Sequence, residues 1–126
     1  MKLSTFLIVK TIVSLVFAIA LLVLPGQLAT LWDMASDPAT ILMARYVGVG
    51  LLGIGLVCWF LKDAPHSETR QGILLSLFLA DSIGFIVALY GQLTNVMGAL
   101  GWVNVVIWLL LAVGLAYFRF VKPQAA

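Results

Sequence analysis

The chain has 126 residues, of which 63 % are hydrophobic and only 10 % are charged, and its mean hydropathy is +1.17. A water-soluble domain of this size covers a large surface with polar side chains, and this chain has too few of them. The net charge of +2 is too small to indicate nucleic-acid binding. The composition therefore predicts an integral membrane protein.

Four apolar stretches are long enough to cross a bilayer as helices, which takes about 20 residues for a hydrocarbon core of about 30 Å. The predicted spans cover residues 3–24, 38–61, 68–92 and 96–120. A barrel would instead need short segments that alternate between apolar and polar residues. We therefore predict an all-α fold, an integral membrane four-helix bundle that forms a single domain over residues 1–126.

Local signals mark the ends of several predicted spans. Pro25-Gly26 ends the first span. Asp37 caps the second, with Pro38 at its first position, and Ser67 caps the third. We expect the first span to be retained rather than cleaved as a signal peptide, because Lys10 interrupts its apolar stretch and no site of small residues follows.

The segment between the first two spans has a helical pattern of its own. Apolar residues recur there at helical spacing, at Leu28, Leu31, Trp32 and Ala35. This pattern predicts a short helix lying on the membrane surface. We expect it to be an interfacial anchor, and the alternative is a lid over a substrate site.

The basic residues predict the orientation of the chain in the membrane. An even number of spans places both termini on one side, together with the loop between the second and third spans. That side holds most of the basic residues: Lys2, Lys62, Arg70, Arg119 and Lys122. The opposite loop, between residues 25 and 38, has two aspartates and no Lys or Arg. By the positive-inside rule both termini are cytoplasmic.

Three ionisable side chains lie within the spans. At a helix rise of about 1.5 Å per residue, Lys10 lies roughly 10 Å from the cytoplasmic end, Arg45 roughly 10 Å from the outer end, and Asp81 near the midplane. A charge at the centre costs about 2.5–3.5 kcal/mol, so these groups should face protein or water. Asp81 either forms a structural ion pair with Lys10 or Arg45, or binds a proton or a cationic ligand. Arg45 has a further option, pairing with Asp33 or Asp37 at the outer surface.

Small residues form a stripe along the third span, one at every fourth position: Gly72, Ser76, Ala80, Gly84 and Ala88. Such a stripe lets helix backbones approach closely in lipid, within one chain or between copies. The second span matches the dinucleotide fingerprint, but that motif needs a strand-to-helix turn. We interpret Gly48 and Gly55 of that span as helix-packing residues instead.

The chain lacks the residues that most membrane cofactors and active sites require. Cys58 is the only cysteine and His66 the only histidine. A haem with two histidine ligands is excluded, and no cluster resembles a zinc or di-iron site. The serines in the spans have no histidine within the membrane to activate them. We expect no cofactor, no metal and no enzyme activity. Asn104 and Trp108, one turn apart, either contact a ligand or join helices.

Glycine and aromatic motifs recur through most of the chain. They are Leu24-Pro25, then Ala44-Arg45-Tyr46-Val47-Gly48 with Gly55-Leu56 and Trp59, and later Gly101-Trp102 and Tyr117-Phe118. This set resembles small bacterial four-span proteins of unknown function that are placed near the DoxX-like membrane proteins. The resemblance implies a location in the bacterial inner membrane and assigns no site residues.

Two kinds of function fit these features. We expect a non-catalytic accessory or scaffold protein that binds a membrane-protein partner, another copy of itself or lipid. The alternative is a small proton-linked transporter or ligand-binding protein centred on Asp81, with Lys10 and Arg45 as charge partners. The alternative predicts a polar cavity that reaches Asp81, whereas a scaffold predicts a dry core and an exposed stripe of small residues.

Overall fold

The computed structural model describes residues 1–122, and these residues form helices and no strand. The elements are α1 (Leu3–Val23), α2 (Pro25–Leu31), α3 (Pro38–Leu61), α4 (Glu68–Leu93), α5 (Gly101–Ala116) and a π-helical turn η1 (Tyr117–Val121). Four helical segments are long and apolar enough to cross a membrane: α1, α3, α4 and α5 continued through η1. The prediction of an all-helical, multi-pass membrane protein is confirmed to this extent.

The predicted caps are present at the starts of α3 and α4. Asp37 Oδ1 accepts hydrogen bonds from the backbone amides of Ala39 and Thr40, both at 3.1 Å, and the Thr40 hydroxyl donates to Asp37 Oδ2 at 2.7 Å. Ser67 Oγ accepts from the amide of Arg70 at 3.1 Å. Each cap satisfies amides that have no partner within the first turn of a helix.

The fourth long helix begins at Gly101, so the predicted start at residue 96 is wrong. Asn95 ends the preceding helical region with a positive φ of 60°, a conformation that asparagine tolerates better than most residues. The amide of Gly98 then donates to the carbonyl of Trp32 at 2.8 Å. This bond to a distant part of the chain holds the segment as a turn, although its sequence is apolar enough to extend the helix.

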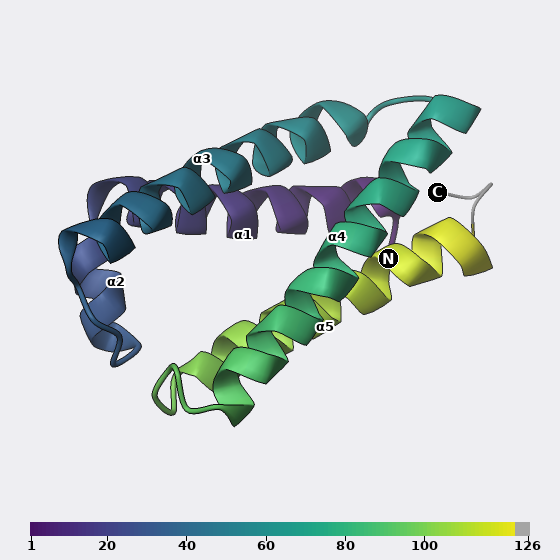
Figure 1. Cartoon of the computed structure of the whole chain (residues 1–126). Coiled ribbons are helices and arrows are strands. Elements are labelled where there is room, and N and C mark those ends of the chain that lie inside the picture. The colour runs from purple at the N-terminus through teal and green to yellow at the C-terminus, as the bar shows by residue number, and fades with distance from the viewer. Residues whose placement is uncertain (123–126) are drawn as a thin grey trace.

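The long helices are arranged as two pairs (Figure 1). α1 packs along α3, and α4 packs along α5. The pairs meet near the N-terminus of α1, where Leu7, Leu74 and Leu115 are fully buried and the rings of Phe6 and Phe118 lie 5.6 Å apart. From this apolar core the two pairs diverge.

α2 bridges the diverging end of the two pairs. In Figure 1 it turns away from the end of α1 toward the turn between α4 and α5. The hydrogen bond between Gly98 and Trp32 joins the two at that point. The Trp32 ring stacks on Phe17 of α1, with centroids 6.1 Å apart and planes 10° apart. The pairs are therefore in contact at both ends, and a space remains between them.

Candidate functional site

A buried ion pair joins the two helix pairs. Lys10 Nζ of α1 donates to Asp81 Oδ2 of α4 at 2.6 Å, and the two side chains are only 2 % and 1 % exposed. The structure thus brings together two of the three ionisable residues singled out within the spans. Because both charged groups are buried between the helices, they can lie within the membrane without facing lipid.

Packing between α1 and α3 positions Lys10. Gly55 of α3 lies so close to α1 that an added Cβ would come within 2.8 Å of the Leu15 side chain. The hydroxyl of Thr11 also donates to the carbonyl of Gly55 at 3.3 Å. With α1 held in this way, Lys10 and Ser14 point toward the second helix pair, since residues four apart share a helix face.

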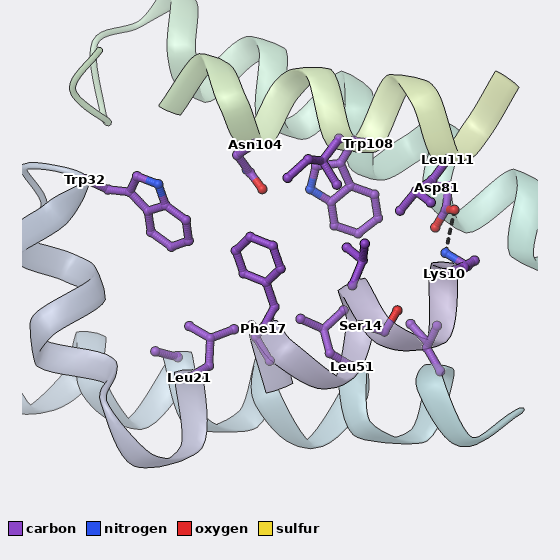
Figure 2. A pocket seen from close by; sticks show the side chains of 15 residues that line it. Lys10, Ser14, Phe17, Leu21, Trp32, Leu51, Asp81, Asn104, Trp108 and Leu111 are labelled. Atoms are coloured by element: carbon purple, nitrogen blue, oxygen red, sulfur yellow. Dashed lines mark hydrogen bonds and ion pairs between the residues drawn. The ribbon is translucent and has the colours of Figure 1, made fainter. Parts of the chain in front are cut away.

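A cavity of about 220 Å³ extends from this ion pair toward Trp32. Figure 2 shows the ion pair at one end of the cavity and Trp32 at the other. α1, α3 and α5 form the walls, while α4 contributes only Asp81 and the residue after α2 contributes Trp32. The polar end therefore lies where the helix pairs converge.

The middle of the cavity is lined by aromatic rings. Phe17 and Trp32 stack on one side, and Trp108 of α5 lies between Phe17 and the ion pair (Figure 2). Trp108 packs directly on the backbone of α4, because a Cβ added to Gly84 would come within 2.5 Å of its ring. The Asn104 side chain, one turn before Trp108, adds an amide to the cavity lining.

The cavity opens sideways along α3. Val47 lines it and is nevertheless 55 % exposed, while Leu51, one turn further along α3, is half-buried. Val47 is the one exposed side chain among the described lining residues, so the most accessible side of the cavity lies along α3. If α3 crosses a bilayer, this opening lies among the lipid chains.

Arg45 does not join the ion pair. It is exposed on α3, does not line the cavity, and forms no ion pair with any residue between 1 and 122. Of its predicted alternative partners, Asp37 is engaged in capping α3. The cavity therefore contains two ionisable groups rather than three.

The small residues singled out in the sequence lie in different environments. Gly48 and Gly55 face α1 closely, and Gly84 faces Trp108. Ala88 is buried. The first part of the stripe on α4 is exposed: Gly72, Ser76 and Ala80.

Two cavity residues were missed at the sequence level. No sequence-based prediction concerns Phe17, and Trp32 is predicted to belong to a short surface helix that is either an interfacial anchor or a lid over a substrate site. The signal for Phe17 was its spacing of seven from Lys10, with Ser14 between them, because this spacing places all three on one face of a helix. No comparable signal exists for Trp32, which reaches the cavity only because α2 turns back toward α5.

Within residues 1–122 no group of three or more His, Cys, Asp or Glu side chains is placed to hold a metal ion. The lining instead offers an ammonium, a carboxylate, a hydroxyl and an amide around aromatic rings. Such a lining suits binding of an organic molecule. No family model, curated protein or solved structure matches this chain.

Proposed function

We propose that the protein binds a small amphipathic molecule that enters the cavity from the bilayer. The observation that carries this proposal is a cavity of about 220 Å³ that ends on the ion pair between Lys10 and Asp81 and opens sideways along α3. An apolar cavity of about 150 Å³ is large enough to hold benzene. There is room here for a ring-sized head group, while a tail could leave through the opening beside Val47.

The composition of the cavity lining supports binding rather than a packing defect. Ligand pockets combine a mainly apolar wall with a few polar groups that converge at one place. Here the polar groups converge at the end formed by Lys10, Ser14 and Asp81. If Lys10 and Asp81 served only to hold the two helix pairs together, apolar side chains in their place would stabilise the contact equally well, because a buried ion pair adds little net stability. The sequence-based alternative included proton transport and ligand binding. The ion pair favours ligand binding, since Lys10 already neutralises the charge of Asp81.

For the membrane setting we keep the sequence-based proposal of a bundle in the bacterial inner membrane with both termini cytoplasmic. The excess of basic residues near the termini and in the loop between α3 and α4 supports the cytoplasmic position of the termini. In this orientation the ion pair lies toward the cytoplasmic side of the cavity. Trp32 and the bridge made by α2 lie at the outer end.

Native mass spectrometry of the protein extracted gently from its own membrane tests the proposal. The wild-type protein should retain a small molecule. Leu51→Trp should lose it, because the larger side chain fills the cavity. Leu52→Trp is the matched control, since Leu52 is 37 % exposed, lies next in the chain and does not line the cavity. Equal retention by the two variants, or an empty wild-type protein, would contradict ligand binding in this cavity.

A second candidate function is the accessory or scaffold role expected from the sequence. It is supported by the exposed part of the α4 stripe, Gly72, Ser76 and Ala80, which leaves a narrow face against which another helix could pack closely. Ala80→Leu should then weaken association with a second copy or with a partner protein. Ile83→Leu, a change at a residue that is 61 % exposed outside the stripe, should not. Equal energy transfer between labelled copies, and equal partner recovery, in wild type and both variants would argue against this role.

A further inference from the structure

The charge balance of the cavity restricts the ligand. Lys10 and Asp81 are the only Asp, Glu, Lys, Arg or His side chains in the described lining, and they form a contact with each other at 2.6 Å. Their charges cancel at any position more than a few ångströms away. A charged head group entering the cavity would lose its hydration and meet no net opposite charge, which is costly. The cavity therefore favours an uncharged head group.

The ion pair still offers both kinds of hydrogen bond. An ammonium has three donor hydrogens and a carboxylate has about four acceptor positions, and the bond between Nζ and Oδ2 uses one of each. A hydroxyl group donates one hydrogen bond and accepts others. Placed beside the pair, one hydroxyl can donate to Asp81 and accept from Lys10, so that it bonds to both partners without adding charge.

The aromatic lining restricts the shape of the head group. Phe17, Trp32 and Trp108 present rings to the cavity from α1, the end of α2 and α5. Aromatic rings pack well on other flat rings in stacked or edge-to-face geometry. The volume of about 220 Å³ admits one ring with a few additional carbons. A longer alkyl tail would have to pass beside Val47 into the lipid.

We infer that the ligand is an uncharged amphiphile of the phenol class, in which a hydroxyl-bearing aromatic ring lies among Phe17, Trp32 and Trp108, its hydroxyl bonds to Lys10 and Asp81, and its apolar tail leaves along α3. This inference rests on the proposed ligand-binding function and names the chemistry of its ligand. It assigns the ion pair the role of recognising the hydroxyl.

Four probes that differ only in the group opposite the alkyl tail test the inference. They are 4-nonylphenol, nonylbenzene, the trimethylammonium analogue and the sulfonate analogue of nonylbenzene. Binding is followed in nanodiscs by the indole N–H signals of the four tryptophans. Trp32 and Trp108 line the cavity, whereas Trp59 and Trp102 are each 46 % exposed and lie outside it, so they report nonspecific uptake into the lipid.

We expect 4-nonylphenol to shift the Trp32 and Trp108 signals with a Kd about 10-fold or more below that of nonylbenzene, and below those of both charged probes. In the double variant Lys10→Met/Asp81→Leu the ring still fits but the hydroxyl has no charged partner. The phenol should then lose its advantage and bind like nonylbenzene. This variant tests recognition without leaving an unpaired buried charge.

The other outcomes distinguish a wrong ligand class from the absence of ligand binding. Selective shifts of Trp32 and Trp108 by all probes with similar affinity, or tighter binding of a charged probe, would overturn the phenol assignment and leave ligand binding in place. A phenol preference that survives in the double variant would overturn the role of the ion pair. No selective shift with any probe would refute the phenol assignment, while the proposed function would still be judged by the retained molecule in the Leu51→Trp and Leu52→Trp comparison.

Discussion

The ion pair between the two helix pairs should be far more costly to break than to replace. At 2.6 Å the attraction between Lys10 and Asp81 is about 6 kcal/mol at an effective dielectric constant of about 20, but burial of the two charges offsets most of it. Lys10→Met or Asp81→Leu alone leaves one buried charge without its partner. Each should lower the free energy of unfolding by about 3–5 kcal/mol. The double variant Lys10→Met/Asp81→Leu should be close to wild type, or more stable.

Equilibrium unfolding in mixed micelles, followed by helical circular dichroism at increasing denaturing-detergent fraction, measures these differences. The double-mutant cycle then gives the coupling between the two residues. The reasoning is refuted if the double variant loses as much stability as the two single variants together, because the charges would then act independently. A single variant with a loss below about 1 kcal/mol would show that the remaining charge reaches water.

Two further predictions concern the cavity wall and the start of α3. Gly84→Ala should displace Trp108, which lowers the free energy of unfolding by about 1–3 kcal/mol and shifts the indole signal of Trp108. Gly91→Ala is the control: an added Cβ there meets nothing within 4 Å, so the Trp108 signal should stay unchanged. At the start of α3, the hydrogen bond from the Thr40 hydroxyl, followed by that from its amide, lowers the pKa of Asp37. The cap should therefore stabilise α3 fully above the ordinary pKa of an aspartate and be lost as the pH falls through the lowered value. Protection of the Thr40 amide, measured as its exchange rate relative to the intrinsic rate at the same pH, should therefore fall over that acidic range. An Asp37→Asn protein with the same protection profile would contradict this explanation.

Much of the fold could be predicted because the signals are local. Span lengths follow from hydropathy, and the caps at Asp37 and Ser67 depend on residues within one turn. The start of α5 could not be predicted in this way. It depends on the bond between Gly98 and Trp32, which are far apart in the sequence.

The site was only partly predictable, because a site depends on which way each helix face points. Lys10 and Asp81 could be identified because a charged side chain in the hydrocarbon core has a high free-energy cost, which favours pairing of opposite charges. Arg45 carries the same cost but lies on the outer face of α3. The face toward α1 is marked by Gly48 and Gly55, and Arg45 lies only three residues before Gly48, so spacing along the helix could not show that its side chain is exposed. The path of the α4–α5 turn and the position of Trp32 arise only when the two helix pairs meet.

The separation of the ion pair along the chain has a consequence for biogenesis. Lys10 precedes Asp81 by 71 residues. At about 5–20 residues per second, the ribosome takes on the order of 4–14 s to extend the chain from Lys10 to Asp81. α1 and α3 form a hairpin and can pack along each other before α4 is made, although the apolar core that they share with α4 and α5 forms only later. During this interval the hairpin carries an unpaired ammonium, which must extend toward the lipid head groups. Insertion of the second hairpin draws that charge inward, so a chain that stops before Asp81 differs chemically, and not only in length, from the finished protein.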